Sequence, residues 1–170
     1  MTEDARPPFS RRVMIRLMPV VFRIVNVPMR LILSLPTATP LGERLMLVYL
    51  TGRKTGRHYR QPVSYVRDGE TLLTPGGGKW KLNLVDGEPT HVRLRGEDIS
   101  LRPELVRDPD EVERLLDLMS AKNPMVRRFV PIPKQDGHYD RERLTLALRH
   151  GFCIVRWTPP KPSTGETTAN

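Results

Sequence analysis

The sequence predicts an α+β protein built around a small, closed or nearly closed antiparallel barrel. Two observations lead to this prediction. Short apolar or alternating segments joined by tight turns dominate the middle of the chain, and amphipathic helical patterns flank them. A length of 170 residues suits one domain with its own hydrophobic core. We expect a helical extension over residues 1–40, the barrel domain over residues 41–158 and a disordered tail over residues 159–170.

The first expected element is an amphipathic helix over Ser10–Leu35. Polar or helix-disrupting residues recur there every three or four positions, so they form a narrow seam and leave a broad apolar face. Arg16 and Arg23 interrupt any apolar run of the ~18 residues that a membrane span needs. Two interpretations remain open: the helix packs on the barrel or on a partner subunit, or it lies in the plane of an anionic membrane.

The strands of the barrel are expected where apolar or alternating runs end at turn residues. They lie at Arg44–Leu50, Tyr59–Arg67, Thr71–Thr74, Thr90–Arg95, Ile99–Leu105 and Phe152–Trp157. Gly69 predicts a tight turn between the second and third strands, and Gly96-Glu97-Asp98 predicts another between the fourth and fifth. A single helical turn is expected over Lys79–Leu84.

Two helices are expected before the last strand. Asp108 is a suitable N-cap with Pro109 in the first helical position, and an apolar stripe follows. Asn123–Pro133 reads as a short helix and a proline-rich loop. A second amphipathic helix runs over Asp140–Arg149, and Gly151 ends it.

Two glycine-containing loops, Thr51–Arg60 and Pro75–Lys81, suggest an anion site at one end of the barrel. In the first loop, Gly52 and Gly56 bracket cationic residues, and glycines allow backbone N–H groups to converge on an anion. The second loop contains Gly76-Gly77-Gly78, which permits close approach of a ligand. We therefore expect a phosphate-bearing ligand at this end.

Composition narrows the classes of partner and chemistry. The net charge of +9 attracts anions without specifying which ones, but only Tyr59 is interleaved with the basic residues of the first loop, so nucleic acid is disfavoured. Cys153 is the only cysteine, which fits a reducing, cytoplasmic setting, and we expect it to be a small core residue. The four histidines lack metal-ligand spacing, so no metal site is predicted.

No motif supplies intrinsic chemistry. The chain has no G-x-S-x-G and no G-x-G-x-x-G, and Gly52-Arg53-Lys54-Thr55 lacks the earlier glycine of a phosphate-binding loop of nucleotide hydrolases. Redox chemistry would therefore depend on a cofactor.

The order of motifs over roughly Leu45–Leu94 resembles the deazaflavin-dependent nitroreductase family. The matching elements are TGRKTGR, then Pro62-Val63, an Asp-Gly turn, the glycine-rich loop and W-x-x-N-L. The resemblance implies a split β-barrel fold, as in flavin reductases and pyridoxamine-phosphate oxidases. One departure is that Lys79 alone occupies the place of a longer loop in the family. The pocket should therefore be open, or roofed by the N-terminal helix or by Asn123–Tyr139.

The resemblance also implies a function. The chain would use the 8-hydroxy-5-deazaflavin cofactor (coenzyme F-420), with FMN as an alternative, to transfer hydride to a quinone, enone or nitro-aromatic acceptor. A non-catalytic barrel that binds a lipid or another hydrophobic ligand at the membrane is the alternative, and the protein would be a monomer or homodimer, cytoplasmic or peripheral on the inner face of the membrane.

Catalytic residues remain unassigned, and Tyr65 and Tyr139 are the phenols considered as proton donors. The residues expected to bind the cofactor lie in the two loops and the segments after them: Thr51, Gly52, Arg53, Lys54, Thr55, Gly56, Arg57, Arg60, Gln61, Pro62, Val63, Pro75, Gly76, Gly77, Gly78, Lys79, Trp80, Asn83 and Leu84.

Overall fold

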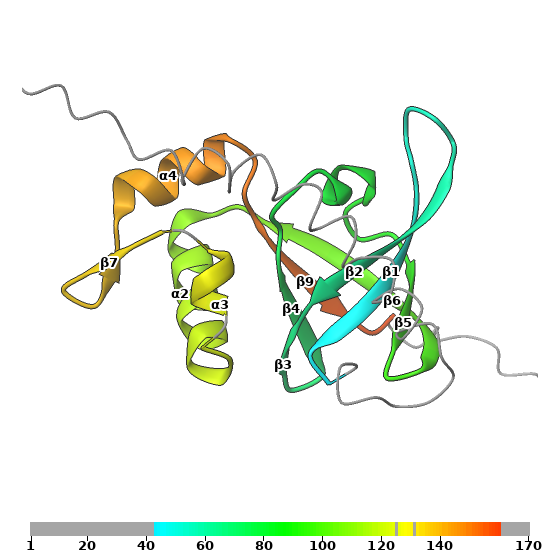
Figure 1. Cartoon of the computed structure of the whole chain (residues 1–170), viewed down its shortest axis with the longest axis horizontal. Coiled ribbons are helices and arrows are strands. Elements are labelled where there is room, and N and C mark those ends of the chain that lie inside the picture. The colour runs from blue at the N-terminus through cyan, green and yellow to red at the C-terminus, as the bar shows by residue number, and fades with distance from the viewer. Residues whose placement is uncertain (1–42, 125, 131, 161–170) are drawn as a thin grey trace, which may run out of the picture.

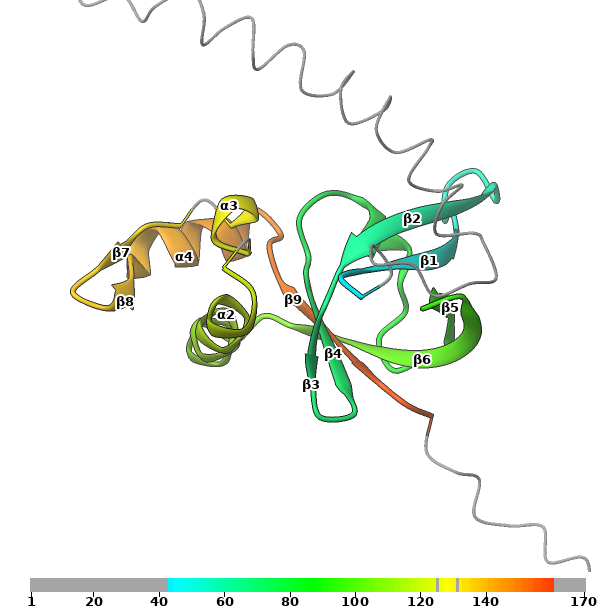
Figure 2. The same cartoon turned by 60° about the horizontal axis from the view of Figure 1, so that its bottom comes forward.

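The computed structural model describes residues 43–124, 126–130 and 132–160. The predicted N-terminal extension, and the tail beyond residue 160, lie outside the described residues. A curled antiparallel sheet forms one side of the molecule and the helices gather on the other (Figure 1, Figure 2). The predicted α+β architecture is confirmed.

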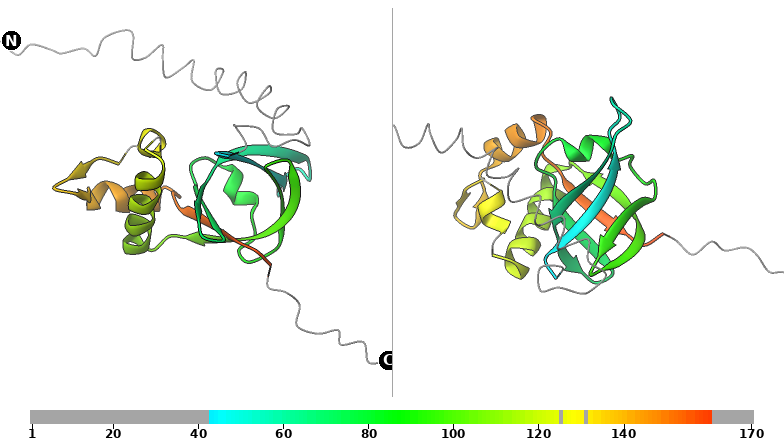
Figure 3. Two further views of the ribbon diagram at one scale, coloured as in Figure 1. Left: turned by 90° about the horizontal axis from the view of Figure 1, so that it is seen from below. Right: turned by 45° about the vertical axis from the view of Figure 1, so that its right-hand side comes forward.

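Seven strands form one antiparallel sheet in the order β2-β1-β5-β6-β9-β4-β3. Their bounds are β1 Leu45–Thr51, β2 His58–Ser64, β3 Val66–Asp68, β4 Thr71–Pro75, β5 Thr90–Leu94, β6 Glu97–Val106 and β9 Ile154–Thr158. Only Tyr65 separates β2 from β3, so the two outer strands of the sheet are consecutive parts of one segment. This connection curls the sheet into a barrel-like ring (Figure 3, left).

The alternation of the strands decides which side chains fill the barrel. Successive side chains of a strand point to opposite faces, and Tyr59, Val63 and Tyr65 of the segment β2–β3 point into the barrel. They pack there with the inward residues of the other strands, and Trp157 of β9 is fully buried among them. Cys153 also lies in this core, which confirms its predicted role as a small buried residue.

The helices cover the outer face of one part of the barrel. They are α2 Pro109–Lys122, α3 Val126–Phe129 and α4 Arg141–Arg149, with a small hairpin of β7 Lys134–Gln135 and β8 His138–Tyr139 between the last two. Leu73 and Ile154, on the outer side of β4 and β9, pack with Leu116 and Leu144 of the helices in a second core. The carboxylate of Asp108 accepts a hydrogen bond from the Glu111 N–H, so the predicted N-cap is confirmed.

The structure corrects one predicted turn. Strands β5 and β6 are joined by the two-residue turn Arg95-Gly96, both with positive φ, and not by Gly96-Glu97-Asp98. Asp98 instead belongs to β6, where it faces Arg93 and accepts a hydrogen bond from its Nε at 3.0 Å. This cross-strand ion pair favours the shorter turn, whose twist matches that of the flanking strands. Among the described residues, no helix is long and apolar enough to span a membrane.

Candidate functional site

The two predicted loops lie at the same end of the barrel and are joined by one side chain. The first is the turn between β1 and β2, and the second contains the 3-10 helix η1 (Trp80–Asn83). The Asn83 Oδ1 accepts a hydrogen bond from the Arg53 N–H at 3.0 Å, and its Nδ2 donates to the Tyr59 hydroxyl and to the Trp80 carbonyl. Asn83 therefore fixes the turn against η1, a role that the W-x-x-N-L pattern did not reveal by itself.

The backbone of the basic turn does not form the predicted anion-binding nest. The Gly52 N–H donates to the Arg57 carbonyl, while the N–H groups of Thr55 and Gly56 both donate to the Gly52 carbonyl, at 3.1 and 2.7 Å. The Arg53 N–H is used by Asn83. The expectation of converging backbone donors is therefore wrong, because these donors close the turn on itself.

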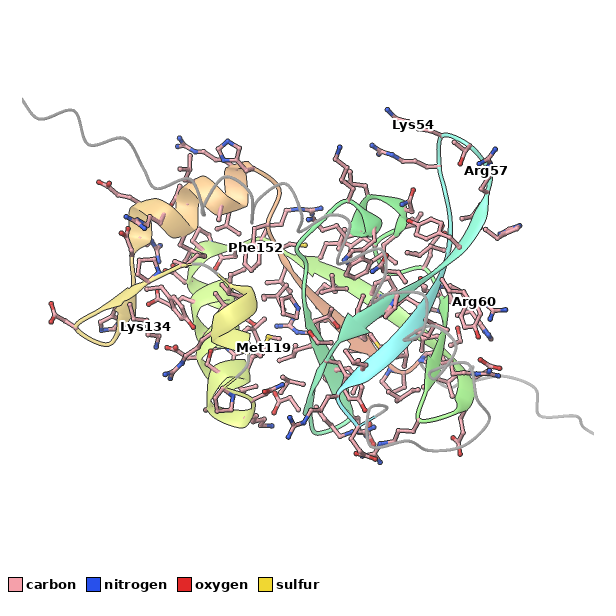
Figure 4. The ribbon with its side chains drawn as sticks, viewed as in Figure 1. Lys54, Arg57, Arg60, Met119, Lys134 and Phe152 are labelled. Carbon is pink, nitrogen blue, oxygen red and sulfur yellow. The ribbon has the colours of Figure 1, made fainter. Side chains whose placement is uncertain are left out.

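The side chains of the turn are available instead. Arg53, Lys54 and Arg57 are exposed, and their side chains make no hydrogen bond or ion pair in the described part of the protein. Figure 4 shows Lys54 and Arg57 at the tip of the turn, projecting away from the barrel. The chain has no acidic residue from Arg44 to Arg67 that could pair with them locally. Any anion bound here would contact the side chains of the turn, through charge-assisted hydrogen bonds.

The glycine-rich loop is held by packing and by a buried lysine. The Gly76 N–H donates to the Cys153 carbonyl at 2.8 Å, and a Cβ at Gly76 would lie 2.5 Å from the Cys153 Sγ, so only glycine fits. The Lys81 Nζ donates to the carbonyls of Gly76 and Gly78, at 2.5 and 2.8 Å. Lys81 is only 8% exposed, and burial lowers the pKa of its ammonium group. Its charge therefore faces the loop from inside and does not add to the exposed positive charge of the turn.

A cavity of about 780 Å³ lies between this loop and the helical part of the molecule. Its volume is within the usual range for a ligand site. One wall consists of the glycine loop and the start of η1, and the other of α4 and the segments around it. The lining residues are Gly76, Gly77, Gly78, Lys79, Lys81, Leu82, Val130, Ile132, Arg143, Leu146, Ala147, His150, Gly151 and Phe152.

The opposite wall was predicted only in part. Val130 and Ile132 come from the Asn123–Tyr139 region that the sequence suggested as a roof, but α4 contributes more of the wall. Its lining residues at positions 143, 146 and 147, together with the C-cap residue His150, follow the spacing of one helix face. That spacing was visible in the sequence, but nothing local indicated that this face would meet the glycine loop.

Several predicted site residues are part of the barrel core and do not line the cavity. The Trp80 ring stacks on that of Trp157, with ring centroids 6.5 Å apart, and closes this end of the barrel core. Val63 and Leu84 are buried in the same core, and Pro62 is buried as well. These side chains are not among those that line the cavity.

The remaining candidates on β1, β2 and β4 have local partners. The Thr51 hydroxyl lies 3.0 Å from the His58 Nδ1, and the Arg60 guanidinium lies over the Tyr49 ring at 5.4 Å. The Gln61 Nε2 donates to the Pro62 carbonyl. Pro75 ends β4 directly before the glycine loop.

The two phenols considered as proton donors are both buried away from the cavity. Tyr65 lies in the barrel core, where burial raises its pKa. Tyr139 lies in the helical core, with its hydroxyl 3.2 Å from the Ser120 Oγ and its ring beside the Lys134 ammonium. Neither lines the cavity. In the described ranges, no group of three His, Cys, Asp or Glu residues is placed to hold a metal ion.

Comparison with known proteins gives little beyond this geometry. No family model matches the chain, and no curated protein matches it. One similar solved structure is a proposed 5-nitroimidazole antibiotic resistance protein from Bacteroides thetaiotaomicron, with 11% sequence identity and a TM-score of 0.41 over 69% of this chain and 74% of that chain. A similarity of this size does not establish a shared fold or function.

Proposed function

We propose that the protein is an oxidoreductase of the split β-barrel type that binds a reduced deazaflavin cofactor. It would transfer hydride to a quinone, enone or nitro-aromatic acceptor. The observation that carries this proposal is the position of three exposed cations, Arg53, Lys54 and Arg57, which have no ion pair among the described residues, in a turn hydrogen-bonded to the loop that bounds the cavity. The motif order over Leu45–Leu94 supports the same assignment.

The residues present fit the two parts of such a cofactor. Its phosphate and glutamate tail is anionic, and the cations of the turn are the groups that would hold it. Its ring system is large, flat and aromatic, and the cavity offers about 780 Å³ beside Gly77, where the added Cβ of a side chain would meet nothing within 4 Å. The turn does not line the cavity, so a ligand that reaches both must pass across η1, with Lys79 on the cavity side.

When bound, the reduced deazaflavin would supply the hydride, and the chain would supply position and a proton donor. His150 is a titratable group on the cavity wall. Its Nδ1 lies 2.8 Å from the Leu146 carbonyl, which can only accept, so Nδ1 carries a proton and Nε2 is left to exchange one with a bound acceptor. His150 therefore replaces Tyr65 and Tyr139 as the proposed proton donor.

A second candidate function is the binding of a lipid or another hydrophobic ligand without catalysis. The apolar side chains of the cavity wall favour it: Leu82, Val130, Ile132, Leu146 and Phe152 all contribute. FMN is an alternative cofactor, since its phosphate would satisfy the same cations.

Titration of the purified full chain with deazaflavin, followed by fluorescence quenching, tests the proposal. An Arg53→Ala, Lys54→Ala double variant should bind more weakly by roughly 2–4 kcal/mol, taking ~1.5–3 kcal/mol for each charge-assisted hydrogen bond and allowing for exposure. The control removes two exposed cations of α2, Arg114→Ala with Lys122→Ala, and should keep the wild-type affinity. Equal affinities of wild type and the turn variant would remove the site assignment. Parallel titrations with FMN and with lipid extracts distinguish the alternatives.

A further inference from the structure

The turn between β1 and β2, η1 and α4 form one face around the mouth of the cavity, here called the mouth face. These three elements lie along the same upper edge of the molecule in Figure 1 and in the right panel of Figure 3. We propose that the mouth face docks on an anionic membrane surface, so that the cavity opens toward the bilayer. This inference assigns a membrane contact to the folded barrel domain and does not depend on the N-terminal segment.

The mouth face carries exposed apolar side chains at the cavity rim. Leu82 of η1 is 48% exposed and Leu146 of α4 is 54% exposed, and both line the cavity from opposite walls. Val85, shortly after η1, is 55% exposed. Single exposed leucines are ordinary, but here the exposed large hydrophobic residues of the described chain occur in the segments that flank one cavity.

Cations without an ion pair among the described residues lie on or beside the same three elements. Lys54, Arg57, Lys79 and Arg149 are exposed, and their side chains make no hydrogen bond or ion pair in the described part of the chain. The sequence also has no acidic residue from Thr71 to Val85. Asp86, which follows this segment, accepts a hydrogen bond from the Leu105 N–H. An anionic surface can therefore approach η1 and the turn with little local charge repulsion.

The opposite end of the barrel differs in this respect. Arg95 in the β5–β6 turn pairs with Glu43, and Lys122 at the end of α2 pairs with Asp68. These two cations are therefore neutralised by the chain itself.

The combination of apolar and basic side chains identifies the partner. Anionic lipid headgroups attract the cations, while the interfacial region beneath them accepts side chains such as Leu82 and Leu146. Nucleic acid would satisfy the cations but would leave exposed leucines without a partner. Docking in this orientation would let a hydrophobic ligand pass from lipid into the cavity without crossing water.

Co-sedimentation of the full chain with vesicles tests the proposal. The protein should bind vesicles that contain phosphatidylglycerol at low salt, and binding should fall with added salt and be weak with neutral phosphatidylcholine vesicles. A Lys54→Gln, Arg57→Gln, Arg149→Gln variant should bind at least about tenfold more weakly, since each cation near a charged surface contributes roughly fivefold. Leu82→Ser with Leu146→Ser should also weaken binding, without any change of charge.

The control variant removes three paired cations elsewhere, Arg95→Gln, Arg114→Gln and Lys122→Gln, and so has the same net charge. It should bind like wild type, and thermal melts should show that all variants remain folded. Equal weakening by both triple variants, or unchanged binding by the mouth-face variants, would overturn the proposal. So would binding to single-stranded nucleic acid that displaces the vesicles. Cofactor titration without vesicles tests the proposed function separately, so failure of one result leaves the other interpretable.

Discussion

Replacing Lys81 with methionine should destabilise the protein by disrupting the glycine-rich loop. The ammonium group donates to the carbonyls of Gly76 and Gly78, and a methionine side chain would leave both without this donor. A hydrogen bond from a charged donor contributes ~1.5–3 kcal/mol, but burial of the ammonium group costs several kcal/mol and offsets much of this gain. We expect a net loss of about 1–3 kcal/mol, or a decrease in Tm of roughly 2–10 °C for a chain of this size.

The pH dependence of this effect has a defined sign. Burial lowers the pKa of Lys81 below the usual value of 10.5. Between the lowered folded pKa and 10.5, the unfolded chain binds more protons than the folded one, so stability rises with pH across this interval. Wild type should therefore gain stability relative to the Lys81→Met variant as pH rises through that interval. The gain is lost again as pH falls.

Thermal melts of both proteins over a series of buffers would measure this difference. Lys79→Met is the matched control. Lys79 lies two residues before Lys81 and its side chain is exposed, so the variant removes the same charge without removing a buried donor. Its Tm should stay close to that of wild type at every pH. Equal melting of Lys81→Met and Lys79→Met would refute the clamping role of Lys81.

Two further predictions concern stability. Gly76→Ala should destabilise the protein by about 1–3 kcal/mol, because the new Cβ would lie 2.5 Å from the Cys153 Sγ. The control is Gly77→Ala, whose Cβ meets no atom within 4 Å and whose Tm should stay near that of wild type. Equal Tm values of the two variants would contradict this. Glu111 has a pKa lowered from 4.5 to about 2, first by the Arg114 guanidinium and also by an arginine of β9. Its contribution to stability is therefore present above pH 4.5 and lost as pH falls toward about 2. Glu111→Gln should make the free energy of unfolding depend less on pH in this acid range. If wild type and the variant lose stability in parallel as pH falls, the ion pairs of Glu111 do not cause the acid dependence.

The strands and helices were predictable because their sequence signals are local. Alternation and tight-turn residues located the barrel strands to within a few positions, and Asp108 marked the start of α2. The turn at Arg95-Gly96 was missed because its position depends on the cross-strand partner of Asp98, and pairing across strands cannot be read from one segment. The β7–β8 hairpin was missed because strands of two residues carry no periodicity.

The sequence predicted only the part of the site that is built from segments close together in the chain. The sequence correctly brought the basic turn and the glycine loop together, since each joins strands at one end of the same sheet. It did not show that the turn uses its own N–H groups internally, because glycine permits both a closed turn and an open nest. His150 was missed for a different reason: α4 lies far along the chain, and its approach to the glycine loop is set by the packing of the second core.

Because the loop between Gly78 and Trp80 is short, the variable wall of the cavity is the one formed by α4. Stacking on Trp157 fixes Trp80 against the barrel, and the Lys81 clamp holds the glycine loop from inside, so this wall has little freedom to adapt to a ligand. A single residue, Lys79, is too short a connection to fold over the cavity. The α4 wall, in contrast, presents an exposed side chain at Leu146 and a titratable one at His150. In the proposed function, the shape and polarity that distinguish one acceptor from another would therefore reside in the α4 face, and the glycine loop would supply a fixed floor common to all of them.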